Sequence, residues 1–183
     1  SESTMHNVLK TLHTEHAHIC RVLDFLDTQI DLLEKGGNPE WDLMRDVMHY
    51  MTNFPDIYHH PKEDLVFNRL RQRQSGAIPE IDDILHEHGE LSKMGQKFRA
   101  AIQEVEGGSV MSTEDFSKMA RGYVDVQRRH VELEERAVFT LAKKFLRPED
   151  WTEVDKAIES QPDPMFGHMV KDEYKLIRSA ICD

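Results

Sequence analysis

Apolar residues recur along almost the whole chain at the three- and four-residue intervals of an amphipathic helix. They predict four long helices, over residues 5–34, 39–74, 79–106 and 113–146. Gly36-Gly37 and Gly107-Gly108 suit helix ends, Pro39 and Pro79 suit helix starts, and Ser75-Gly76 follows the second helix. No alternating stretch rich in valine and isoleucine predicts a strand. Because the connections are short, we expect an all-α, up-down four-helix bundle.

The last part of the chain has a different pattern. Pro148 breaks the fourth helix, and we expect a short helix over 149–160, a turn-rich connector over 161–167 and a last helix over 168–181. Four apolar side chains predict that this tail packs on the bundle: Trp151, Phe166, Leu176 and Ile177. We therefore expect one domain over 1–183, with a bundle over 5–146 and a helical extension over 147–183.

A repeat relates the two halves of the predicted bundle. The pair Glu15-His16 recurs as Glu87-His88, at an offset of 72 in the numbering, among matching apolar positions. His59 and Glu63 recur at an offset of 71, as His130 and Glu134. The two helical hairpins therefore resemble copies related by an approximate two-fold axis, and whatever lies at their centre should be nearly symmetric.

A helical wheel at about 100° per residue places several of these polar residues on apolar faces. His16 lies in the middle of an apolar stripe, between Leu12 and Ile19, and His88 lies in a matching stripe. His130 and Glu134 also share a face with apolar residues. All four side chains are therefore expected to point into the core.

The same wheel divides the motif HHPKED, at residues 59–64. His59 and Glu63 share a face with apolar residues. His60 and Asp64 share a face with polar ones, and Phe67 is the only large apolar member. We expect His59 and Glu63 to point inward, and His60 and Asp64 to point to water or the rim of the bundle.

One histidine on an apolar face is usually a hydrogen-bonded core residue. Here four core-facing histidines come from four helices, together with two glutamates, and burying an unpaired carboxylate costs several kcal/mol. Bound cations would compensate this charge, so we predict six metal ligands: His16, His59, Glu63, His88, His130 and Glu134. Imidazole and carboxylate without thiolate suit iron, manganese or zinc, and the high share of histidine favours iron.

The charge and cysteine content of the chain indicate which classes of binding partner to expect. The 183 residues include 34 Asp and Glu against 23 Lys and Arg, a net charge of -11. Such a surface repels phosphate backbones and anionic lipid, so we expect neither nucleic acid nor membrane as a partner. Cys20 and Cys182 are the only cysteines, which predicts neither a disulfide framework nor a thiolate zinc site, and a cytoplasmic location is expected.

Four motifs carry a family resemblance: EHAHI at 15–19, FPDIYHHPKED at 54–64, HEHGEL at 86–91 and HVELEE at 130–135. Over residues 5–146 the sequence resembles the hemerythrin-like HHE cation-binding domain. The tail, with DW at 150–151 and DPMFG at 163–167, resembles bacterial members that carry a helical extension. The resemblance implies two non-haem iron ions with an oxo or hydroxo bridge, held by the six residues named above.

The sequence departs from oxygen-carrying hemerythrins at one ligand position. Those proteins have a second histidine four residues before the one that matches His88, and here Ile84 stands in that place. Four histidines leave about one open position per iron, which favours a reactive or sensing site over a dedicated carrier. His13 is a candidate added ligand at the edge of the stripe, and Cys20 is read as a packing residue or a redox residue.

We therefore expect a protein that binds or reacts with O2, peroxide or nitric oxide, in sensing, scavenging or iron handling. A small diatomic or peroxide ligand is the expected partner, and a homodimer is compatible with the sequence. Two alternatives stay open: a di-iron enzyme of the oxidase or peroxidase type, and a helical interaction protein with a structural metal.

Overall fold

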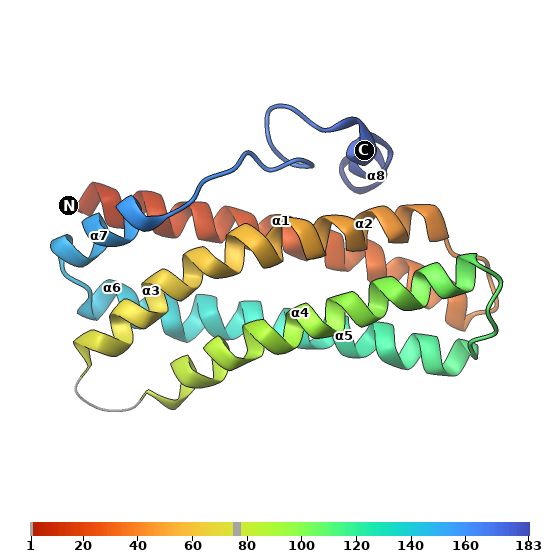
Figure 1. Ribbon diagram of the computed structural model, residues 1–183, viewed down its shortest axis with the longest axis horizontal. Helices are drawn as coiled ribbons and strands as arrows, with labels where there is room; N and C mark the ends of the chain where they lie inside the picture. Colours follow the sequence, from red (N-terminus) through yellow and green to blue (C-terminus); the bar gives the residue numbers. More distant parts are fainter. Residues whose placement is uncertain (1, 75–77) are drawn as a thin grey trace.

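Four helical columns run side by side in the computed structural model, which describes residues 2–74 and 78–183 (Figure 1). The first column is α1 (Glu2–Glu34), and the third is α4 (Pro79–Glu106). The second column consists of α2 (Trp41–Asn53), η1 (Pro55–His59) and α3 (His60–Arg73). The fourth consists of α5 (Thr113–Leu133), η2 (Glu134–Val138) and α6 (Phe139–Phe145). No strand occurs in the described ranges, so the all-α bundle is confirmed.

Glycine ends the first helix of each hairpin. Gly36 has a φ of 82° and Gly108 a φ of 86°, a left-handed backbone that glycine adopts without steric cost. Pro79 begins α4 as expected, whereas α1 begins at Glu2, ahead of the expected residue 5. The turn expected at Ser75-Gly76 lies outside the described residues.

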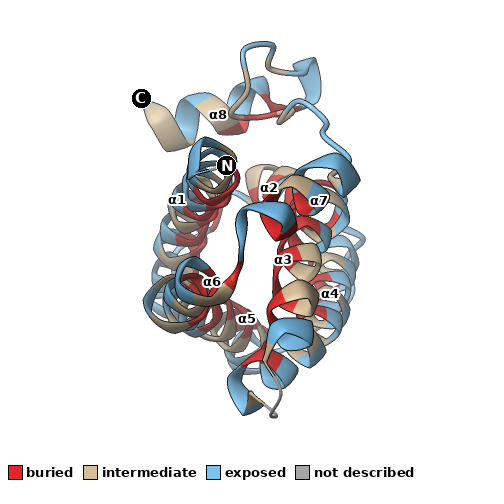
Figure 2. Ribbon diagram, turned by 90° about the vertical axis from the view of Figure 1, so that its left-hand side faces the viewer, coloured by how far each residue is buried: buried red, intermediate tan, exposed pale blue. Residues whose placement is uncertain are grey.

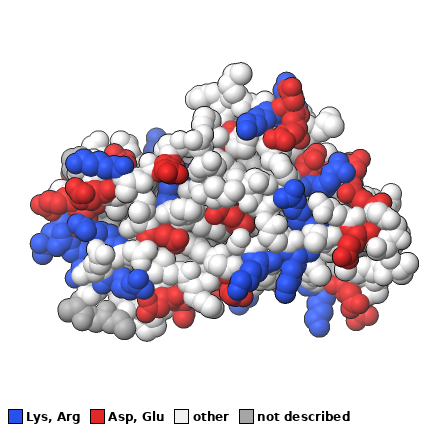
Figure 3. All heavy atoms as spheres, viewed as in Figure 1, with Lys and Arg blue, Asp and Glu red and all other residues white. Residues whose placement is uncertain are grey.

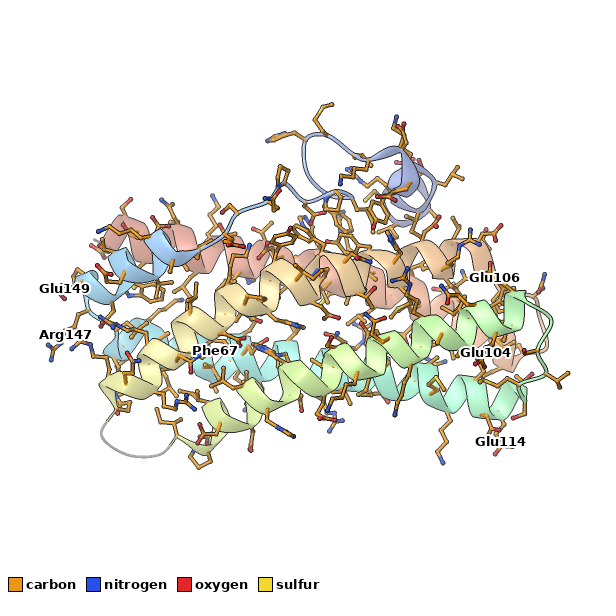
Figure 4. All side chains as sticks on the ribbon, viewed as in Figure 1. Phe67, Glu104, Glu106, Glu114, Arg147 and Glu149 are labelled. Carbon is orange, nitrogen blue, oxygen red and sulfur yellow. The ribbon has the colours of Figure 1, made fainter. Side chains whose placement is uncertain are left out.

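The buried residues lie on the helix faces turned toward the inside of the bundle (Figure 2). They form two apolar clusters, one containing Leu26, Met48 and Phe98, the other containing Leu12, Phe67, Ile84 and Phe139. Phe67 points from α3 toward the bundle interior (Figure 4), and its ring lies 6.1 Å from that of Phe139 on α6. Along each column, buried polar residues separate the two clusters. Such a polar band inside an apolar core requires partners.

Two π-helical turns interrupt the second and fourth columns. In η1 the N–H of His60 donates to the oxygen of Pro55, and in η2 the N–H of Phe139 donates to that of Glu134, five residues back instead of four. The continuous helices expected over 39–74 and 113–146 are therefore each divided. Each turn takes up one more residue than an α-helical turn, which rotates everything beyond it relative to a regular wheel.

The numbering offset that relates the two halves of the internal repeat changes at each π turn. Before η1, buried residues match at an offset of 72, as with Met44 and Phe116. Between the turns the offset is 71, as with Glu63 and Glu134. Beyond η2 it returns to 72, and Phe67 matches Phe139. The change in offset is therefore one extra residue in each column, placed on opposite sides of the histidine and glutamate pair.

The C-terminal extension lies on the bundle. α7 (Pro148–Ala157) packs on α1 and α3, and α8 (Lys175–Cys182) packs on α2 and α1 after a short 3-10 turn, η3 (Asp172–Tyr174). The last helix begins at Lys175, later than the expected residue 168. Before it, Asp163 organises a turn in which its carboxylate accepts the backbone N–H groups of Met165 and Phe166 at 2.9 Å. Ile177 is fully buried, whereas Leu176 is exposed, contrary to the expectation that it packs on the bundle.

Acidic and basic side chains are interspersed on the face of the molecule seen in Figure 3. Within the part of the chain that the structure describes, no helix is long and apolar enough to cross a membrane.

Asp150 fastens α7 to α3. Its carboxylate is fully buried and accepts hydrogen bonds from Arg69 Nε at 2.6 Å and from Arg73 Nε at 2.7 Å. The backbone N–H of Arg147 donates to the same carboxylate at 2.8 Å. Burial alone would raise the pKa of Asp150, but these donors hold that pKa at about 2, below its ordinary value of 3.8.

We expect Asp150→Asn to lower the free energy of unfolding by about 2 kcal/mol at neutral pH, because charge-assisted hydrogen bonds are lost from a buried group. The folded-state pKa is depressed, so this stabilisation is present above the unfolded pKa and fades as the pH falls toward about 2. Urea unfolding at a series of pH values measures both effects. Glu149→Gln, at an exposed neighbour (Figure 4), is the control, and an equal loss there would contradict the assignment.

Candidate metal centre

The structure brings all six predicted ligands together in the polar band between the two apolar clusters. They come from four columns and are all buried: His16 on α1, His59 on η1, Glu63 on α3, His88 on α4, His130 on α5 and Glu134 on η2. The side chains of Glu63 and Glu134 are almost inaccessible to solvent, at 0% and 1%. Two carboxylates thus lie at the centre of the bundle, with four imidazoles around them.

Every one of the four imidazoles directs Nε2 toward the central carboxylates. His16 Nε2 lies 3.0 Å from Glu63 Oε2 and 3.3 Å from Glu134 Oε1. His88 Nε2 lies 3.3 Å from Glu63 Oε1 and 3.4 Å from Glu134 Oε2. The other two imidazoles contact the glutamate of their own column. His59 Nε2 lies 3.2 Å from Glu63 Oε1, and His130 Nε2 lies 3.1 Å from Glu134 Oε1.

The other ring nitrogen of each histidine meets an outer carboxylate. The four Nδ1 contacts are His16 with Glu135 at 2.7 Å, His59 with Glu15 at 2.9 Å, His88 with Asp64 at 2.6 Å, and His130 with Glu87 at 2.8 Å. An outer carboxylate that holds Nδ1–H fixes the tautomer and leaves the Nε2 lone pair free to bind a cation. This arrangement is typical of metal-binding histidines.

Three central atoms have no hydrogen-bond partner in the ranges that the structure describes: Glu63 Oε1, Glu134 Oε1 and His130 Nε2. They are nevertheless within 3.1 to 3.3 Å of one another or of neighbouring ring nitrogens. Close approach without hydrogen-bond geometry is expected when lone pairs converge on a common point. The donors therefore fit cations that accept imidazole nitrogen and carboxylate oxygen, such as iron, manganese or zinc.

The donor atoms fall into two groups that share Glu63. Position A is formed by His16, His59 and Glu63, and position B contains Glu63, His88, His130 and one further histidine, His60. Within each group the donor atoms lie within 4.8 Å of one another. A shared carboxylate is the usual means by which a helical bundle holds two metal ions close together.

The charges of the centre depend on one another. Burial lowers the pKa of His88, but hydrogen bonds to Asp64 and Glu134 and the negative charge of Glu63 outweigh it and raise that pKa to about 12. Burial favours a raised pKa for Glu63, but the charge of His59 and a hydrogen bond from His16 hold it well below the ordinary value. Without a bound cation, protonated imidazoles therefore balance the buried carboxylates. A metal ion would replace those protons.

His60 does not lie where the helical wheel placed it. Its side chain is buried, and its ring stacks on that of His88 with centroids 4.4 Å apart and planes 10° from parallel. The prediction was wrong because the wheel was carried through η1, whose extra residue turns His60 inward. Burial and the charge of His88 lower the pKa of His60 well below its ordinary value, so the ring is neutral. Asp64 does lie at the rim, where it binds His88.

Two other candidate residues lie outside the centre. The side chain of His13 is 70% exposed and binds Glu135 rather than the central carboxylates. Cys20 is half-buried beside the first apolar cluster, where burial raises the pKa of its thiol.

The outer carboxylates were not predicted from the sequence. The signal for them was present in the repeat, because Glu15 and Glu87 match at the offset of 72 and Asp64 and Glu135 match at the offset of 71. Each outer carboxylate therefore repeats at the same offset as the predicted ligand next to it in the sequence. Asp64 contacts His88 and Glu135 contacts His16, so each half of the bundle supplies one outer carboxylate to the other half.

Comparison with known proteins agrees with this geometry. The family model described as the hemerythrin HHE cation binding domain matches residues 7–142, which include all six predicted ligands. No curated protein and no solved structure matches the chain.

Proposed function

The chain belongs to the hemerythrin HHE cation-binding domain family, and from this membership and its site we propose a non-haem di-iron protein that binds or reacts with O2, peroxide or nitric oxide. The observation that carries the proposal is the meeting of positions A and B on one buried carboxylate, Glu63. Two cations that share this ligand would be close enough to act on one small molecule.

The donor atoms favour iron over the other cations. Imidazole and carboxylate without thiolate accept iron, manganese and zinc, and the high ratio of histidine to carboxylate favours iron among them. Bound iron would supply electrons to O2 or peroxide, and a coordination position to nitric oxide. Sensing, scavenging and iron handling all require such a centre.

The chain's own residues protect and orient the centre. Leu12, Ile84 and Leu91 are buried beside the ligand-bearing turns and exclude water from it. Phe139 stacks on His16, with ring centroids 5.4 Å apart and planes 4° from parallel, and so fixes the plane of that imidazole. A dry, fixed set of ligands favours reaction with small uncharged molecules over exchange with bulk water.

We expect the reduced, iron-loaded protein to be oxidised rapidly by O2, without reversible oxygen binding, because position A, with two histidines, would leave its ion an open coordination position and Ile84 supplies no carrier-type histidine on the helix of His88. Stopped-flow absorbance after mixing with oxygenated buffer measures the rate. Ile84→His should slow the oxidation and move the spectrum toward that of an oxygen carrier. Recovery of intact O2 from the unmutated protein under vacuum would contradict the proposal and indicate a carrier.

A further inference from the structure

The repeat makes the two metal positions nearly equivalent. In position A the rings of His16 and His59 have centroids 4.8 Å apart, and in position B those of His88 and His130 are also 4.8 Å apart. Each of these histidines has an outer carboxylate on Nδ1, and both positions face the same two glutamates. Any side chain present at only one position therefore distinguishes the two.

His60 is such a side chain. The matching residue in the second half, at the offset of 71, is Val131, which is buried and cannot bind a metal. The ring of His60 lies 4.4 Å from that of His88 and 6.0 Å from that of His130, and its donor atom belongs to the position B group. Position B therefore has a third histidine within reach, whereas position A has two.

A carboxylate also lies beside His60, at ion-pair distance rather than in the hydrogen bond that each of the other four histidines makes to its outer carboxylate. Its Nδ1 lies 3.4 Å from Asp56 Oδ1, one helical turn earlier, and both side chains are only 6% exposed. Neither oxygen of Asp56 has a hydrogen-bond partner among the residues that the structure describes. The residue that matches Asp56 at the offset of 71 is Gln127, so the second half lacks this pair as well.

We propose that His60 is a third histidine ligand of position B, oriented by Asp56, and that the two metal ions are consequently unequal. This inference rests on the proposed di-iron function. Position B would be richer in ligands and would bind its ion more tightly. Position A would keep the open coordination position at which a small molecule binds.

A surface cavity lies on the side of position A. It has a volume of about 100 Å³ and is lined in part by Leu12, one turn before His16, and by Lys62. Lys62 Nζ binds Glu15 Oε2 at 2.6 Å, and Glu15 in turn holds His59. Lys62 and Glu15 therefore connect the wall of this cavity to His59, a ligand of position A, through two polar contacts.

The proposal can be tested by Mössbauer spectroscopy of protein loaded anaerobically with ferrous ⁵⁷Fe, alongside metal analysis. Two resolved doublets of equal area are expected for the unmutated protein, one from each position. His60→Val, which copies the residue at 131, should merge them into one and weaken the tighter of two binding steps by about 10- to 100-fold. His86→Val is the matched control, because His86 is exposed on α4 and points away from the centre, and it should leave both doublets unchanged.

Two further variants keep the test decisive if His60→Val does not fold. Val131→His should give position A its own third histidine and merge the doublets from the opposite direction. Asp56→Asn should keep two irons but shift one doublet only, as expected for a positioning residue. Two bound irons with a single doublet in the unmutated protein, or two doublets unchanged in all three variants, would overturn the inference and leave the di-iron function intact. Failure of the unmutated protein to bind two irons would instead overturn the proposed function.

Discussion

Removing iron from the loaded protein is expected to lower its melting temperature by about 10 °C or more. The six predicted ligands come from all four columns of the bundle, so bound ions would join every column to the others. An ion at a thousand times its dissociation constant adds about 4 kcal/mol, and each kcal/mol shifts the melting temperature of a chain this size by about 2–4 °C. Without metal, protonated histidines can balance the charge of the glutamates, but they stabilise the contacts between the helices less than bound ions would.

Metal analysis and calorimetry measure this effect together. Protein from iron-replete cells should carry about two irons per chain. Adding ferrous iron to the stripped protein should restore the melting temperature. Magnesium is the matched control, because it prefers oxygen ligands and should not restore it. One zinc per chain that iron cannot replace would contradict the di-iron assignment.

Glu63→Gln is expected to abolish binding of both ions, the largest effect of any single substitution at the centre. Glu63 belongs to both position A and position B, and its oxygens lie within 3.3 Å of Nε2 of His16, His59 and His88. Glutamine keeps the volume but removes the charge that offsets two cations. Metal content per chain, with circular dichroism to confirm folding, measures the loss.

The control for this prediction is Glu132→Gln, which removes an exposed carboxylate from α5 and should retain both ions. The contrast with Glu87→Gln is also informative. Loss of that outer carboxylate should weaken binding by about 10- to 100-fold without abolishing it, because His130 keeps its Nε2 contact. If Glu63→Gln retained two irons, Glu63 could not be the shared ligand.

Sequence periodicity predicted the bundle and the inward direction of the six predicted ligands, because α-helical faces extend over many residues and the apolar stripes are long. His16 and His88 lie in uninterrupted helices, where the wheel holds from end to end. The wheel failed for His60, which follows a π turn that no local residue pattern reveals. Pro55 signals a disturbance there, but it does not say that the helix continues with one more residue per turn.

Contacts between helices were the second feature that could not be predicted from the sequence. Glu135 binds His16 and Asp64 binds His88 across the bundle, so these pairs depend on how the helices pack rather than on spacing within one helix. The packing of the C-terminal extension was also predicted only in part. Both Leu176 and Ile177 were expected to help pack the tail on the bundle, but adjacent residues of a helix lie about 100° apart, and only Ile177 is on the face of α8 that contacts the bundle.

The two π turns also bear on the ancestry of the chain. Duplication of one hairpin would produce a single offset throughout, whereas the offset here changes from 72 to 71 at η1 and returns to 72 at η2. The simplest history is one inserted residue in each copy after the duplication, ahead of the histidine and glutamate pair in the first and behind the histidine in the second. His60 directly follows η1, so the extra residue that ends the exact equivalence of the two hairpins also turns a fifth histidine toward the centre.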